Sequence, residues 1–216
     1  AAPPASTPFA ATDFRPGDSI GFDPAHTRFG FELRTRWGQR VDGRFPGHDG
    51  ALVILPDGRH QVRIRLTTAA VEVEDSERYT EIARGERFFD SANYPVIEFV
   101  SEPHPAELAH DGGKLRGRLS MHGVSRIETF VVAPATCARP GRDCDVVASG
   151  SVDRDDYGLD RWRLALTDKV SFDMRVRLQD APRFVYIGSR RSLTGLNADQ
   201  WIAPRPGTEA AEPTDA

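Results

Sequence analysis

Apolar and polar residues alternate with a period of two along most of the chain between residues 19 and 180. Successive side chains of a β-strand point to opposite faces, so this alternation is typical of strands with one buried and one solvated face. The clearest example covers residues 170–178, whose apolar members are Val170, Phe172, Met174, Val176 and Leu178. The alternation predicts an all-β fold.

Turn residues such as Pro56-Asp57-Gly58 separate neighbouring alternating runs. The runs predict eight to ten antiparallel strands, arranged either as a sandwich or as a closed barrel, and the pattern does not choose between the two. Residues 76–90 depart from the period of two. Their apolar spacing predicts one short helix, with Asp75 or Ser76 as its N-cap.

Composition divides the chain into four parts. Residues 1–18 predict a flexible leader and residues 204–216 a disordered tail, because neither stretch can bury enough apolar surface to offset the entropy of ordering. Residues 19–180 are expected to form the single folded domain. Residues 181–203 hold a further apolar run and predict a C-terminal extension that packs on this domain.

Charge and apolar content limit the classes of partner. The formal net charge of -4 and the pI near 5.9 leave no excess of positive charge for nucleic acid. No stretch approaches the roughly 18 consecutive apolar residues that cross a bilayer, so membrane contact is expected to be peripheral at most.

Two features indicate export. The chain starts with small residues and no Met, as after cleavage by signal peptidase. Cys137 and Cys144 flank a segment that contains Pro140 and Gly141, where a turn can bring the two sulfurs together. We therefore predict a Cys137–Cys144 disulfide, which implies an oxidising compartment. Two cysteines alone make a poor zinc site.

Seven short phrases follow one another in a fixed order. They lie at residues 22–27 (Phe-Asp-Pro-Ala-His-Thr), 43–45 (Gly-Arg-Phe), 87–90 (Arg-Phe-Phe-Asp), 94–99 (Tyr-Pro-Val-Ile-Glu-Phe), 117–126, 153–159 and 168–170. Together they resemble the YceI-like family of lipocalin-like bacterial barrels that bind polyisoprenoids. The extension after Gln179 and the loop with the two cysteines depart from the family pattern.

The resemblance implies an antiparallel β-barrel of about eight strands, periplasmic or secreted, that holds an isoprenoid chain such as a polyprenyl phosphate or a quinone tail. A barrel of about eight strands has an interior just wide enough for side chains or one slender ligand. The implied function is carriage or sequestration of this lipid, without catalysis and without a cofactor other than the lipid itself.

Candidate lipid-binding residues are those that the alternation points inward. They are Phe29, Phe31, Leu33, Val62, Ile64, Ile97, Phe99, Leu119, Phe172, Met174 and Val176. A phosphate head would need paired donors, for which Arg44, Arg126 and Arg154 are candidates because they lie in family-like turn phrases. A neutral head such as a quinone would need one hydroxyl or amide, which Tyr157 or Asn93 could supply.

Two rival functions stay open. An enzyme acting on a lipid-linked substrate would use His26 or His122 with a carboxylate, although each histidine is better explained as a hydrogen-bonding partner of a turn. A solid barrel would instead be an interaction module that forms a homodimer through residues 183–201. We predict no catalytic residue and no metal site, because hydrolase, metalloprotease and phosphate-loop motifs do not occur. His104 and His110 flank a Pro-containing loop and are expected to be exposed.

Overall fold

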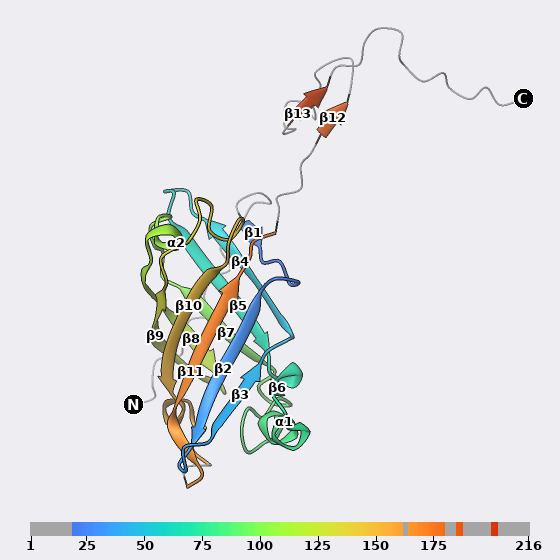
Figure 1. Cartoon of the computed structure of the whole chain (residues 1–216), viewed down its shortest axis with the longest axis vertical. Coiled ribbons are helices and arrows are strands. Elements are labelled where there is room, and N and C mark those ends of the chain that lie inside the picture. The colour runs from blue at the N-terminus through green and yellow to red at the C-terminus, as the bar shows by residue number, and fades with distance from the viewer. Residues whose placement is uncertain (1–18, 162–163, 180–184, 188–199, 203–216) are drawn as a thin grey trace, which may run out of the picture. The chain divides into compact units, whose positions relative to one another are not determined.

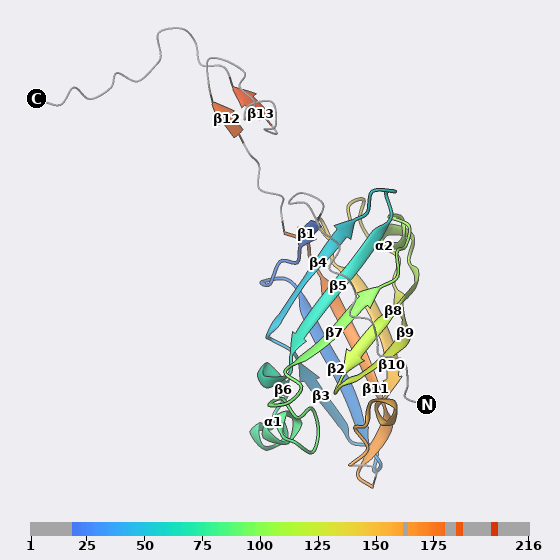
Figure 2. The same cartoon turned by 180° about the vertical axis from the view of Figure 1, so that it is seen from behind.

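The computed structural model describes residues 19–161, 164–179, 185–187 and 200–202. The chain divides into two compact units at Gln179, and the first unit is a curled β-sheet (Figures 1 and 2). The predicted leader at residues 1–18, the predicted tail at 204–216 and most of the extension at 181–203 lie outside the described residues. In the second unit, β12 (Val185–Ile187) pairs in parallel with β13 (Gln200–Ile202).

The first unit contains an eleven-stranded sheet in the order β1-β4-β5-β7-β8-β9-β10-β11-β2-β3-β6, in which every pairing is antiparallel. The strands are β1 (Ser19–Gly21), β2 (Arg28–Thr35), β3 (Arg40–Arg44), β4 (His48–Ile54), β5 (His60–Thr67), β6 (Glu72–Val73), β7 (Val96–Ser101), β8 (Gly113–Met121), β9 (Val124–Val132), β10 (Val146–Asp153) and β11 (Leu166–Val176). The predicted all-β, lipocalin-like barrel is confirmed.

The predicted number of about eight strands is wrong, because three long runs of strand are each broken in two. A turn at residues 23–27 separates β1 from β2, the 3₁₀ helix η1 (Thr68–Ala70) separates β5 from β6, and Phe45-Pro46-Gly47 separates β3 from β4. Proline has no N–H to donate to a ladder, so Pro46 interrupts its strand. The alternation changes phase across these breaks, as from Ile64 and Leu66 before η1 to Val71 and Val73 after it.

Hydrogen bonds near residue 22 join the two sides of the sheet. The Phe22 N–H donates to the Gly50 carbonyl of β4 at 2.9 Å, and the Asp23 N–H donates to the Arg177 carbonyl just beyond β11 at 2.8 Å. The Gln179 N–H returns to the Gly21 carbonyl at 2.8 Å. The chain around Phe22 therefore bridges β4 and the end of β11, which curls the sheet into a barrel.

The predicted short helix is confirmed as α1 (Glu77–Arg84), and Ser76 caps it by accepting a hydrogen bond from the Tyr79 N–H at 3.1 Å. The sequence analysis missed α2 (Leu108–Asp111) and the 3₁₀ helix η2 (Arg154–Tyr157). Each is one turn long, which is too short to establish a helical period. The two α-helices lie near opposite ends of the barrel (Figure 1).

Aromatic rings fill the middle of the barrel because glycines on neighbouring strands leave room for them. A Cβ at Gly117 would lie 2.5 Å from the Phe99 ring, and a Cβ at Gly150 would lie 2.6 Å from the Phe130 ring. The Phe99 and Phe130 rings meet edge to face, with centroids 5.1 Å apart. The core is therefore aromatic at mid-height, which shapes the space that remains at each end.

Candidate ligand-binding cavity

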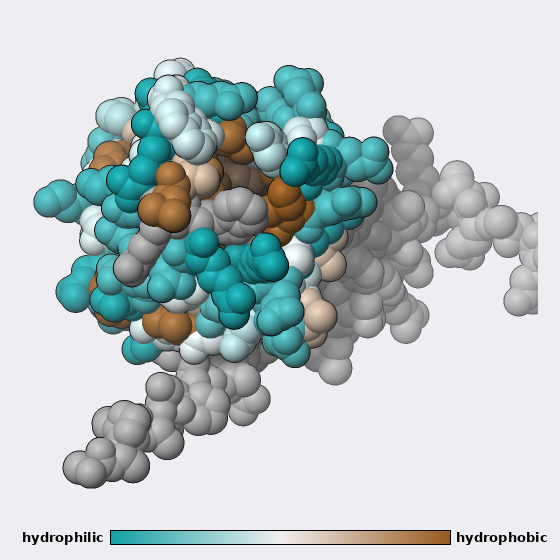
Figure 3. Space-filling view, turned by 90° about the horizontal axis from the view of Figure 1, so that it is seen from below, coloured by the Kyte–Doolittle hydropathy of each residue, from teal (hydrophilic) through white to brown (hydrophobic). Residues whose placement is uncertain are grey.

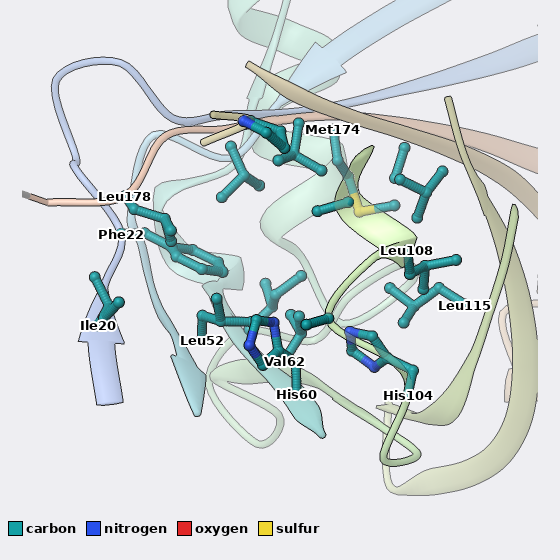
Figure 4. A pocket seen from close by; sticks show the side chains of 18 of the residues that line it. Ile20, Phe22, Leu52, His60, Val62, His104, Leu108, Leu115, Met174 and Leu178 are labelled. Atoms are coloured by element: carbon teal, nitrogen blue, oxygen red, sulfur yellow. The ribbon is translucent and has the colours of Figure 1, made fainter. Parts of the chain in front are cut away.

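The barrel holds an apolar cavity of about 270 Å³ at the end where α2 lies. We call it the main cavity. Twenty residues line it, and eighteen of them are apolar, contributed by β1, β4, β5, β7, α2, β8, β9, β10, β11 and nearby loops. Figure 4 shows side chains such as Phe22, Leu108 and Met174 arranged around the space. Its volume lies at the lower end of ligand pockets, which measure about 300–1,000 Å³.

The interior narrows beyond the main cavity. The next space along the barrel measures only about 30 Å³ and is bounded by nine apolar residues that include Phe99, Phe130 and Phe172. The Phe130 and Phe172 ring centroids are 6.4 Å apart. We call this constriction the phenylalanine waist. It shares Ile64, Phe99 and Met174 with the main cavity, so the two spaces adjoin.

A second apolar cavity of about 190 Å³ lies at the α1 end, between this helix and the neighbouring ends of β2, β3 and β11. Phe31, Val41, Ile82 and Leu166 are among its lining residues, together with Trp37, which is 79% exposed. Figure 3 looks at this end of the barrel and shows hydrophobic residues around a hollow. The described residues thus form an apolar cavity near each end of the barrel, and the waist adjoins the main cavity.

All eleven residues expected to bind lipid line one of these spaces. Five lie on the main cavity: Val62, Ile64, Phe99, Met174 and Val176. Four others lie only at the waist: Phe29, Ile97, Leu119 and Phe172. The remaining two, Phe31 and Leu33, lie on the second cavity. Their inward orientation matches the alternation, whereas their role in lipid binding stays a prediction.

The arginines suggested for a phosphate head do not meet at the main cavity, and each already has a protein partner. Arg44 pairs with Glu72 at 2.6 Å, and Arg126 pairs with Asp156 at 3.1 Å. The Arg154 side chain is fully buried and donates to the backbone carbonyls of Thr167, Leu159 and Leu166. Through these hydrogen bonds Arg154 holds the η2 turn against β11.

The candidates for a neutral head also lie away from the main cavity. The buried Tyr157 hydroxyl donates to Glu128 Oε1 at 2.8 Å. Burial, together with this carboxylate, raises the pKa of Tyr157 far above its usual value. Asn93 donates through Nδ2 to Asp90 Oδ2 at 2.9 Å in the turn after α1. Both side chains therefore stabilise local structure.

Sequence reasoning missed the polar residues that do lie on the main cavity, His60 and His104. They are the two non-apolar residues in its lining, and both are partly buried. The expected exposure of His104 is therefore wrong, whereas His110 is exposed as expected. His60 is in phase with the inward Val62 and Ile64, a signal that the sequence analysis did not use, whereas His104 follows a proline outside any alternating run. An isolated bridge between the two residues brings them together.

Burial lowers the pKa of His104 below its usual 6.5, and the positive charge that His60 can carry acts in the same direction. The Glu102 carbonyl, 3.1 Å from His104 Nδ1, partly opposes this change. His104 is therefore neutral at neutral pH and offers one hydrogen-bond donor and one acceptor.

The histidines considered for catalysis do not lie on the main cavity. His26 is exposed and pairs with Asp23 at 2.5 Å in the turn before β2. His122, in the β8–β9 turn, lies 3.2 Å from the Tyr157 carbonyl and packs against the Tyr94 ring with centroids 4.4 Å apart. Both form the local turn contacts expected of them.

The predicted disulfide between Cys137 and Cys144 is confirmed, with their Cα atoms 6.0 Å apart. The loop that it closes reaches the main cavity, because Pro140 is part of the lining. The Gly141 carbonyl accepts a hydrogen bond from the Leu178 N–H at 2.8 Å, and Leu178 also lines the cavity. The disulfide loop thus forms part of the wall at this end.

Two searches of the described residues give negative findings. None of their helices combines the length and apolar character needed to span a membrane. Their His, Cys, Asp and Glu side chains nowhere form a group of three or more suited to a metal ion.

An antiparallel barrel with an apolar interior cavity defines a lipocalin-like class of protein. The YceI-like domain matches residues 21–179, so the chain belongs to the YceI-like family. Among curated proteins, none matches the chain.

Two solved structures share the fold at low sequence identity. BcnA of Burkholderia cenocepacia is 16% identical with a TM-score of 0.60, and the match covers 72% of this chain and 98% of BcnA. A polyisoprenoid-binding domain from Saccharophagus degradans, implicated in plant cell wall breakdown, is 13% identical with a TM-score of 0.57. That match covers 76% of this chain and 99% of the domain.

Proposed function

We propose that the protein binds an isoprenoid lipid by enclosing its apolar chain in the main cavity, and that it carries or sequesters this lipid without chemical change. The observation that carries the proposal is a cavity of about 270 Å³ with eighteen apolar residues among the twenty that line it. Burial of apolar surface contributes about 25 cal/mol per Å². A chain that buries about 200 Å² would therefore gain about 5 kcal/mol before the entropy of association is deducted.

Membership of the YceI-like family and the polyisoprenoid binding named for the Saccharophagus degradans domain support an isoprenoid as the ligand class. The modest volume of the main cavity favours a short isoprenoid, or the head-proximal end of a longer one. The Cys137–Cys144 disulfide supports a periplasmic or secreted location, since such bonds persist in oxidising compartments.

Mass spectrometry of gently purified protein tests the proposal, and we expect it to detect a co-purified isoprenoid. A matched pair of variants locates this lipid. Ala148→Phe inserts a ring into the main cavity, whereas Ser149→Phe places the same ring at the exposed neighbouring position. The first variant should lose the lipid and the second should keep it. Equal lipid content in the two variants would contradict binding in the main cavity.

A further inference from the structure

The polar atoms of the main cavity are concentrated at one place. Among the described residues that line it, His60 and His104 are the two that are not apolar, and none is Lys, Arg, Asp or Glu. Figure 4 shows the two imidazoles on the same side of the space, next to Val62. Within the described lining, a lipid in this cavity can therefore hydrogen-bond to side chains only at the histidines.

Backbone pairing fixes the two histidines relative to each other. The His60 N–H donates to the His104 carbonyl at 2.8 Å, and the His104 N–H donates to the His60 carbonyl at 2.9 Å. The two rings lie edge to face with centroids 6.4 Å apart. Because the reciprocal bonds involve only backbone atoms, they preserve the spacing of the two side chains even when one side chain is replaced.

The hydrogen bonds of His104 determine what it offers a ligand. His104 Nδ1 lies 3.1 Å from the Glu102 carbonyl and 3.4 Å from Ser101 Oγ. The carbonyl can only accept, so the shorter contact is a hydrogen bond when Nδ1 carries the proton. In that neutral tautomer Nε2 is an acceptor. Within the described part of the chain, the His60 side chain makes no hydrogen bond, so its imidazole can donate to a ligand or accept from it.

A phosphate head fits this chemistry poorly. Burying an anion without a charged partner is costly, and the described lining holds no Lys or Arg to pair with it. A hydroxyl or carbonyl group needs only one donor or acceptor from each ring. The lining of the main cavity therefore distinguishes between the two head-group chemistries found among isoprenoid lipids.

We propose that His60 and His104 form the head-group site of the main cavity and that the natural ligand has an uncharged oxygen-bearing head, a hydroxyl or a carbonyl, on its isoprenoid chain. This inference rests on the proposed function, because the chain has to occupy the cavity for its head to reach the histidines.

Three ligands with the same short chain test the inference: farnesol, farnesyl phosphate and the saturated hydrocarbon farnesane. Their affinities are measured near neutral pH by displacement of a neutral solvatochromic dye from the full chain. A hydrogen bond to a protein contributes a net 0.5–1.5 kcal/mol, so farnesol should bind about two- to twelvefold more tightly than farnesane. Farnesyl phosphate should bind more weakly than farnesol by about tenfold or more.

Variants assign this preference to the histidines. His60→Leu and His104→Leu should each reduce the advantage of farnesol over farnesane, and the double variant should remove it. His104→Asn keeps a hydrogen-bonding side chain and should retain part of the advantage. His110→Leu is the matched control, because His110 is exposed and pairs with Asp111 outside the main cavity. Farnesane affinity reports whether each variant is folded with an intact cavity.

The outcomes separate the two proposals. If none of the three ligands displaces the dye, binding of an isoprenoid chain in the cavity is wrong. If farnesane binds and the leucine variants leave the farnesol advantage unchanged, only the histidine site is overturned. Tightest binding by farnesyl phosphate would overturn the neutral head and leave chain binding intact.

Discussion

At the residue scale, polar side chains divide into those that complete the fold and those that face the ligand space. Arg154 was a candidate for a phosphate ligand, but its guanidinium is fully buried and donates to backbone carbonyls. His60 and His104 carry no such structural duty through their Nε2 atoms, and they lie on the main cavity. The neighbours of a polar side chain therefore decide whether its hydrogen bonds stabilise the fold or stay available to a ligand.

Acidification is expected to weaken binding of a neutral ligand. Burial holds the pKa of His104 below 6.5, and a ligand that covers the ring excludes more water and lowers this pKa further. Because the bound state then holds fewer protons than the free state, affinity is highest above the free-state pKa and falls as the pH drops through it. Farnesol affinity should decrease by about threefold or more between about pH 7.5 and about pH 5.

Other titratable and charged groups lie near His104. His60 faces it from β5, and the Glu102 carboxylate lies 3.7 Å from Arg116. The α2 residues on the cavity, Leu108 and Ala109, are apolar. The His104→Asn variant should therefore show a flatter pH profile in the same dye-displacement assay. An unchanged profile in this variant would assign the effect to another group.

At the element scale, the alternation of the strands predicted the interior because a period of two determines which face each side chain occupies. This is why all eleven inward candidates line interior spaces. The strands β1 and β3 escaped prediction, since three and five residues are too few to establish a period of two. The histidine pair also escaped it, because its two members meet through a bridge between distant segments.

The disulfide loop is expected to stabilise both the fold and the cavity wall. Replacing both cysteines, Cys137→Ser with Cys144→Ser, frees a short loop and should lower the free energy of unfolding by about 2.5 kcal/mol. Pro140 and the partner of Gly141, Leu178, should then be less firmly held at the cavity. Urea denaturation measures the first effect, and faster dissociation of farnesol in stopped flow measures the second. Unchanged dissociation would show that the loop does not control ligand release.

At the scale of the whole molecule, the phenylalanine waist limits the length of chain that the barrel can enclose. Only about 30 Å³ is open there, compared with about 270 Å³ in the main cavity. The rings of Phe99, Phe130 and Phe172 meet at this level. For the proposed ligand, chain length would therefore be set by packing in the middle of the barrel and not by the number of strands.

Opening the waist should change the preferred chain length. Phe130→Ala removes a ring that is 4% exposed and should cost about 3–5 kcal/mol of stability. The cavity created should accept a longer chain, so binding of geranylgeraniol should improve relative to farnesol in the dye-displacement assay. Phe88→Ala, also a buried phenylalanine but outside the waist, controls for loss of stability. A similar change of preference in both variants would contradict the role of the waist.

The waist also has a consequence for how a guest molecule travels. If the main cavity holds a lipid as proposed, a constriction halfway along the barrel leaves that lipid no through route, and it departs in reverse along the path by which it entered. Its apolar tail is the first part in and the last part out. Uptake and release would then both take place at the same end of the barrel, which would have to face first the source of the lipid and later its destination. A second lipid could not displace the first from the opposite end.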